Sequence, residues 1–230
     1  PVGLARISRA TGLNVIMGGS YYVDRAHPPD MDDRSEDDLV EQIVGDITEG
    51  VDETGIKTGV IGEVGCSWPL TNNERKVLRA SGRAQRITGA PILIHPGFDD
   101  QAPLEIIEVL RDAGANLGQT IIGHIDAVVS QLDILKQVAE SGCYIEWDLI
   151  GKEESHFKRF TPNDNTRMDY IAWLSSQGYG DKILVAQDIC DKNRLFKYGG
   201  HGYFFLLANI VPRMRARGFS QDAINKILVE

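Results

Sequence analysis

Long apolar runs, basic clusters and a cysteine framework are all missing from this 230-residue sequence. The longest apolar tract, residues 203–211, contains Asn209 and is shorter than the roughly 18 residues that a membrane span requires. Three cysteines are too few for a disulfide scaffold and fit a reducing compartment. No signal peptide is visible at the N-terminus. The net charge of −9, without a basic stripe, disfavours nucleic acid. We therefore expect a cytoplasmic protein that binds neither membranes nor nucleic acids.

What the sequence does contain is a repeated pattern of a short aliphatic run, a loop and an amphipathic helix. Six such runs do not alternate with polar residues, as is typical of strands that are buried on both faces. They cover residues 14–18, 58–64, 91–95, 120–124, 143–148 and 182–188. Alternating strands and helices predict an α/β protein with a parallel sheet. The 42% apolar content is ample for the core of one domain over residues 1–230.

Helix boundaries are also marked in the sequence. Thr71 and Glu74 form a capping box that predicts a helix start, and Gly89 predicts where this helix ends. Ser35 and Ser220 are further predicted N-caps.

Two architectures fit six parallel strands. A closed (β/α)8 TIM-type barrel needs eight strands and typically about 250 residues, whereas an open doubly wound sheet needs no more than six. The chain opens within a predicted helix, residues 4–10, that has no cap, and it ends inside another helix. We therefore expect a barrel in which strands three to eight are present and the first two are missing. No G-x-G-x-x-G motif follows a strand, so nothing favours a dinucleotide fold.

Residues that commonly bind metals stand at the ends of four predicted strands. They are Glu63, His95, His124 and Asp188. Each alone has a structural explanation: a hydrogen-bonded histidine, a paired glutamate or an N-capping aspartate. Together they favour a functional site, because active sites of parallel β/α folds lie at the carboxyl ends of the strands.

The chemistry of these four residues suits a pair of metal ions. Histidine nitrogens and carboxylate oxygens bind Zn²⁺ and similar ions, and a carboxylate such as Glu63 can bridge two of them. A hydroxide held between the metals would be the nucleophile, and Asp188 would bind one metal and accept the proton. Only one metal has a full set of ligands in this sequence, because the second lacks histidine nitrogens.

Three segments resemble the phosphotriesterase-related proteins of the amidohydrolase superfamily. They are GVIGEVGCSWPLTNNERKVLRASGRAQRITGAPILIHPG, ILVAQDI and KYGGHGY. The resemblance implies a (β/α)8 barrel with two divalent metal ions, usually zinc. It also implies that the six strands are strands three to eight, and that an H-x-H pair on the first strand would complete the second metal site.

The resemblance also implies a role for each metal-type residue. Glu63 occupies the position of a carboxylated lysine that bridges both metals in phosphotriesterases. His95 and His124 correspond to ligands of the more exposed metal. Asp188 corresponds to an aspartate that is both ligand and proton acceptor.

The sequence departs from phosphotriesterases at two proton-relay positions. A histidine and an aspartate of that relay are replaced by Leu149 and Ala127. This change argues against organophosphate hydrolysis, although the neighbouring Asp126 could substitute in part.

Loops beyond the strands are expected to form the substrate pocket. The candidate substrate-binding residues are Tyr21, Tyr22, Trp68, His201 and Tyr203. The glycines around His201 fit a phosphate cradle, but a flexible hinge or close packing is the favoured explanation.

The sequence as a whole predicts a metal-dependent hydrolase that cleaves an ester, lactone or N-acyl amide with a hydroxide bridged by two metals. The expected partner is a small-molecule substrate, and a homodimer is compatible with the sequence. The alternatives are phosphotriesterase activity and a non-catalytic barrel that binds a small ligand. We expect the 230 residues alone to show little activity.

Overall fold

The computed structural model describes residues 1–152 and 161–229. The chain divides into two compact units, residues 1–122 (unit 1) and residues 123–230 (unit 2). Each unit is an α/β arrangement, and every strand pair described within a unit is parallel. None of the helices in the described part of the chain is long and apolar enough to span a membrane. The expectation of a single domain over the whole chain stays a prediction.

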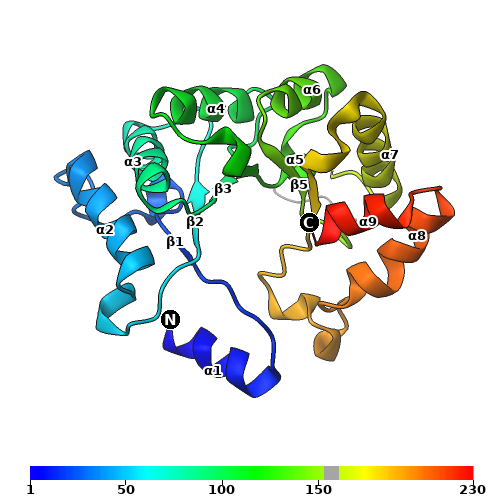
Figure 1. Ribbon diagram of the computed structural model, residues 1–230, viewed down its shortest axis with the longest axis horizontal. Coiled ribbons are helices and arrows are strands. Elements are labelled where there is room, and N and C mark those ends of the chain that lie inside the picture. The colour runs from blue at the N-terminus through cyan, green and yellow to red at the C-terminus, as the bar shows by residue number, and fades with distance from the viewer. Residues whose placement is uncertain (153–160, 230) are drawn as a thin grey trace. The chain divides into compact units, whose positions relative to one another are not determined.

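Unit 1 contains four strands in the order β1-β2-β3-β4, of which the first three are labelled in Figure 1. They are β1 (Gly18–Gly19), β2 (Val60–Gly65), β3 (Ile92–His95) and β4 (Thr120–Ile122). Ile61 pairs with Ile92, and Ile92 pairs with Thr120, so the registers of the central strands are aligned. The central strands carry fully buried side chains, as unalternating aliphatic runs predict: Ile61, Val64, Ile92, Ile94 and Ile122.

Helices of unit 1 follow the predicted caps. The unit contains α1 (Val2–Thr11), η1 (Asp24–Ala26), α2 (Glu36–Thr48), η2 (Val51–Glu53), α3 (Asn72–Thr88), α4 (Ala102–Asp112) and η3 (Leu117–Gln119). Ser35 caps α2, and Thr71 with Glu74 forms the predicted capping box of α3. Gly89 ends α3 in the left-handed conformation, at φ 74°. Helix α3 packs between α2 and α4 and against β2 (Figure 1).

Unit 2 contains two paired strands, β5 (Tyr144–Trp147) and β6 (Ile183–Val185). Its helical segments are α5 (Ile125–Val128), α6 (Leu132–Glu140), α7 (Asp164–Leu174), η4 (Ser175–Tyr179), η5 (Gly180–Lys182), η6 (Lys192–Arg194), η7 (Phe196–Tyr198), η8 (Leu206–Ile210), α8 (Val211–Ala216) and α9 (Gln221–Leu228). Helix α9, capped by Ser220 as predicted, packs against β6 and α8. Trp147, Ile145 and Ile183 are almost completely buried in this unit's core.

The predicted first strand is displaced. Residues 14–18 were expected to form it, but β1 comprises only Gly18 and Gly19. Val15 and Ile16 are exposed instead. The cause is close backbone approach, because a Cβ on Gly18 would lie 2.0 Å from the carbonyl oxygen of Gly62. Only glycine can pair so closely with β2, and the aliphatic residues before it remain outside the ladder.

Candidate active site

In unit 1, the carboxyl ends of β2 and β3 bring Glu63 and His95 together. Glu63 Oε2 lies 3.4 Å from His95 Nδ1, and both side chains are partly exposed. An irregularity between Ile61 and Val64 interrupts the register of β2 at this point. Gly62 makes it possible: its φ is 138°, and a Cβ there would lie 2.3 Å from the Leu93 carbonyl oxygen. Two of the four predicted ligands therefore share one edge of the unit 1 strands.

The two tyrosines after β1 have different surroundings. The Tyr22 hydroxyl lies 3.2 Å from both ring nitrogens of His95, and the two rings meet edge to face. Tyr21 is buried; its hydroxyl donates to Gln42 and accepts from Arg34. Burial raises the pKa of the Tyr21 hydroxyl, although Arg34 opposes the effect. These contacts place Tyr22 beside a predicted ligand and favour a structural role for Tyr21.

The loops after β2 and β3 are packed closely against each other. A Cβ on Gly97, in the loop after His95, would lie 2.5 Å from the backbone of Ser67. Trp68, the next residue, is 39% exposed and therefore accessible to a small molecule. Glu74 stabilises the loop after β2, because its carboxylate accepts hydrogen bonds from Ser67 and from the backbone amides of Asp24 and Thr71. One buried carboxylate thus connects the loops that follow β1 and β2.

In unit 2, His124 is held at two points by Asp148. The backbone amide of His124 donates to Asp148 Oδ2 at 2.8 Å, and its Nδ1 lies 2.7 Å from Asp148 Oδ1. Both side chains are buried. Because a carboxylate only accepts, Nδ1 carries the proton in this hydrogen bond. This is the arrangement in which a carboxylate orients a metal-binding histidine.

Asp188 follows β6 by three residues and is half-buried. Its backbone carbonyl accepts a hydrogen bond from Arg194 Nη1 at 2.8 Å. Its φ is 39°, and that of His124 is 51°. The left-handed region costs a residue with a side chain about 1–2 kcal/mol, and such conformations concentrate at functional sites. Two of the four predicted ligands therefore have the backbone geometry expected of a site.

A buried ion-pair network behind His124 was not predicted from the sequence. Arg167 is fully buried; its Nε donates to Asp126 at 2.6 Å and its Nη1 to Asp164 at 2.8 Å. Its Nη2 donates to the carbonyl oxygen of Lys152. Burial and the negative charge of Asp148 raise the pKa of Asp126 to about 6, while Arg167 opposes this rise. The sequence around Arg167 gave no sign that this arginine would be buried.

This network argues against the expectation that Asp126 substitutes for a residue of the proton relay. The side chain of Asp126 is inaccessible to solvent, and its Oδ2 accepts from Arg167 and from the Leu149 amide. Leu149 itself is buried. Asp126 therefore has a structural role, because it binds Arg167 and the backbone amide of Leu149 in the turn after β5.

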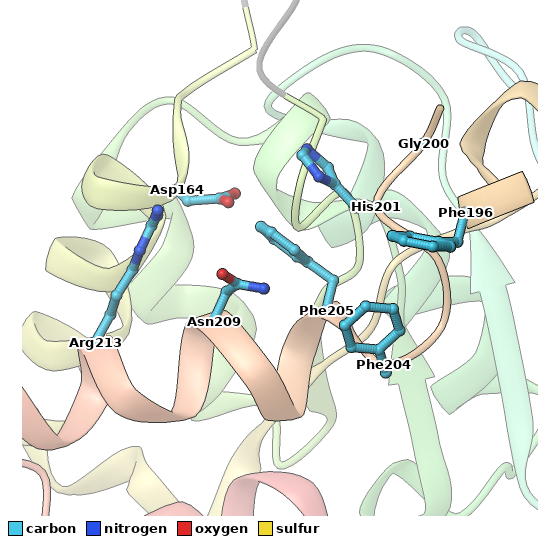
Figure 2. A pocket seen from close by; sticks show the side chains of 8 residues that line it. All are labelled: Asp164, Phe196, Gly200, His201, Phe204, Phe205, Asn209 and Arg213. Atoms are coloured by element: carbon cyan, nitrogen blue, oxygen red, sulfur yellow. The ribbon is translucent and has the colours of Figure 1, made fainter. Parts of the chain in front are cut away.

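The remaining predicted substrate residues, His201 and Tyr203, lie in the loop between β6 and η8. His201 stacks on Phe205 with ring centroids 4.2 Å apart and lines a cavity of about 400 Å³ in unit 2 (Figure 2). Tyr203 is 68% exposed and is not among the residues that line this cavity. Gln187 donates to the Gly202 carbonyl oxygen, so the loop is attached to the residue before Asp188.

Parallel strands joined by helices, with carboxylate and imidazole groups at the strand ends, define the class of α/β proteins that build their sites at this edge. Within that class, the chain belongs to the phosphotriesterase family, whose sequence profile matches residues 2–230. The family that the sequence resembles is therefore confirmed.

Individual relatives agree with this assignment. The chain is 45% identical to an N-acetyltaurine hydrolase of Dictyostelium discoideum, over 100% of this chain and 63% of that protein. A resiniferatoxin-binding protein from Rhodobacter sphaeroides superposes with a TM-score of 0.95 at 33% identity, covering 100% of this chain and 64% of that one. The phosphotriesterase homology protein of Escherichia coli, complexed with phosphate in its active site, superposes with a TM-score of 0.88 at 31% identity, covering 97% and 74%. The chain spans less than two thirds of the length of the curated relatives that it matches.

Proposed function

We propose that this protein is a metal-dependent hydrolase that cleaves an N-acyl amide or a related ester or lactone. The observation that carries the proposal is the set of imidazole and carboxylate groups at strand ends, in a chain of the phosphotriesterase family. The relative at 45% identity is named for hydrolysis of N-acetyltaurine, an N-acyl amide. We extend that bond type to this chain.

The donor set fits a divalent metal ion. The family pattern implies Glu63 and His95 of unit 1 and His124 of unit 2 as ligands, which offer one carboxylate oxygen and two imidazole nitrogens. Such mixed nitrogen and oxygen ligands suit zinc. We propose that Asp188 and Glu63 contribute to a second ion, as the family pattern implies.

Divalent ions bound there would polarise the scissile carbonyl and supply a deprotonated water at neutral pH. The protein's own groups do the rest. Asp148 keeps the proton of His124 on Nδ1, which leaves Nε2 as the nitrogen that would bind a metal ion. Asp188, half-buried and fixed through its carbonyl by Arg194, is the group that would accept the proton. Tyr22, in contact with His95, is placed to contact substrate near the ligands.

Phosphotriester hydrolysis is the weaker alternative. The relay positions hold Leu149 and Ala127, neither of which can carry a proton. Asp126 is engaged by Arg167 and shielded from solvent.

The proposal is tested by measuring zinc-dependent hydrolysis by the full-length protein across a panel of N-acyl amides, esters, lactones and a phosphotriester. We expect the amides to be cleaved fastest. Asp188→Asn should retain only part of the metal and lose about two to four orders of magnitude in kcat, because general base catalysis contributes that much. Glu108→Ala, which removes an exposed carboxylate from α4, is the matched control and should behave as wild type. Full activity of Asp188→Asn would refute the role of Asp188. Stoichiometric metal without turnover of any panel member would favour the non-catalytic alternative.

A further inference from the structure

The cavity in unit 2 has a polar side and an aromatic side (Figure 2). Phe205, Asn209 and Arg213 follow one another at intervals of one helical turn along η8 and α8, so they face the cavity together. Asp164, at the start of α7, and the loop residue His201 face them in the same view. Gly200, Phe196 and Phe204 complete the lining.

Arg213 is the cationic side chain in the lining of this cavity. The carboxylate of Asp164 is bound by the buried Arg167, which also pairs with Asp126, and it accepts the amide hydrogen of Gly151. Arg213 has no ion pair among the residues that the structure describes, and Asn209 has no hydrogen bond there. An anion entering the cavity therefore meets one uncompensated guanidinium and one amide donor.

The opposite wall is aromatic and accessible. Phe196 and Phe204 meet edge to face with centroids 5.7 Å apart, although they are 71% and 51% exposed. His201 and Phe205 present a second, stacked pair. Large apolar side chains left in contact with water next to a polar cavity are typical of a binding surface, because a ligand that covers them gains the free energy of their burial.

We propose that this cavity binds an amphipathic organic anion, a carboxylate or sulfonate joined to a flat apolar group. The Arg213 guanidinium binds the anionic group, Asn209 donates a further hydrogen bond, and the phenylalanine rings cover the apolar part. The assignment rests on the cavity alone, so it holds or fails independently of the proposed metal chemistry.

The cavity is connected to Asp188 through the loop that follows this residue. The loop that forms its wall begins just after Asp188, and Arg194 in that loop is bonded to the carbonyl oxygens of Asp188 and Ile150. A Cβ on Gly200 would lie 2.2 Å from the Arg194 backbone, so the two parts of the loop are in direct contact. A ligand in the cavity therefore rests on the same loop that holds Asp188 in place.

The test uses two fluorescent probes that differ by one charge, anilinonaphthalenesulfonate and the uncharged phenylnaphthylamine, titrated into the whole chain under native conditions. We expect the sulfonate to bind more tightly than the neutral probe. Arg213→Gln should weaken sulfonate binding by about tenfold or more, since a charge-assisted hydrogen bond is lost, and leave the neutral probe unaffected. Phe204→Ser should weaken the binding of both probes.

Arg215→Gln is the matched control, because Arg215 lies on the same helix and binds Gln221 instead of lining the cavity. It should leave both affinities unchanged. Equal sulfonate affinity in Arg213→Gln, Arg215→Gln and wild type would overturn the proposal. So would equal affinity of wild type for the charged and neutral probes. Arg213 is exposed, so its replacement should not affect folding, and an unchanged near-ultraviolet circular dichroism spectrum verifies this.

Discussion

At the scale of single residues, backbone and side-chain constraints coincide at His124. The residue is held in the left-handed region, its amide and its Nδ1 both bind Asp148, and the ring is buried. Nothing local to the segment TIIGHID favours a positive φ at a histidine. The conformation is therefore stabilised by its surroundings, chiefly by Asp148, which has no other assigned role in the site.

This dependence predicts that Asp148→Ala weakens metal binding. Without the carboxylate, the imidazole of His124 is free to rotate and to exchange tautomers, and loss of such an orienting partner costs about 10–100-fold in metal affinity. Competition with a zinc chelator of known affinity measures the change. Asp133→Ala, which removes an exposed carboxylate from α6 in the same unit, is the control. Equal zinc affinity in the Asp148 variant and wild type would show that Asp148 does not orient a ligand.

Arg167 gives a second prediction at this scale, concerning stability. Arg167→Leu leaves Asp126 and Asp164 buried without their cation. Breaking a buried pair by removing one partner costs about 3–5 kcal/mol in the free energy of unfolding. Denaturant titration followed by circular dichroism measures it. Arg217→Leu, which removes an exposed arginine that pairs with Asp169, should cost less than about 1 kcal/mol. A similar loss of unfolding free energy in both variants would mean that the buried ion pairs of Arg167 contribute no more to stability than an exposed pair.

At the scale of secondary-structure elements, α3 connects a local sequence signal to the site. Burial opposes ionisation of Glu74, but hydrogen bonds from Ser67, Thr71 and Asp24 outweigh it and lower the pKa of its carboxyl. A carboxyl with a lower pKa in the folded state contributes stability above its unfolded pKa. That stability is lost as the pH falls through the folded pKa.

Glu74→Gln should therefore be less stable than wild type at neutral pH, with a difference that narrows as the pH falls below about 4.5. The amide keeps the shape of the side chain but cannot accept three donors as a carboxylate does. Melting temperatures measured between pH 3 and pH 7, roughly the range in which carboxyls titrate, give the difference. A difference in melting temperature that stays constant across that range would contradict the assigned ionisation of Glu74.

The same scale shows what the sequence could predict and what it could not. The caps at Ser35, Thr71 and Ser220 were predictable because capping depends on residues three positions apart. The position of β1 was not, because it depends on the close approach of Gly18 to Gly62, which is distant in sequence. The burial of Arg167 likewise depends on two carboxylates from different segments.

At the scale of the whole molecule, the family could be recognised from three contiguous motifs, and the profile match over residues 2–230 confirms it. The positions of Glu63 and His95 at strand ends were also predictable, because strand ends follow from hydrophobic runs. The cavity of unit 2 was not, since its lining comes from a loop and two helices that are separate in sequence. Only His201 of that lining was a predicted substrate residue.

Metal binding should stabilise the whole molecule. An ion that binds only the folded state, at a concentration of about 100 times its Kd, adds about 2.7 kcal/mol. For a chain of this length that corresponds to roughly 5–10 °C in melting temperature. Differential scanning fluorimetry with and without zinc measures the shift. His27→Ala, which removes a histidine outside the proposed ligand set, should keep the shift, whereas His95→Ala should lose most of it. No shift with zinc in wild-type protein would contradict this prediction.

The central claim is that Glu63, His95 and His124 bind metal, and the metal content of the purified protein tests it most directly. Elemental analysis after exchange into metal-free buffer should find at least about one equivalent of zinc or a similar ion per chain in wild type and in Glu108→Ala. Glu63→Ala and His95→Ala should each contain much less, while remaining folded by circular dichroism. Wild-type protein free of metal after growth and reconstitution with zinc, or variants that keep the wild-type content, would contradict the account.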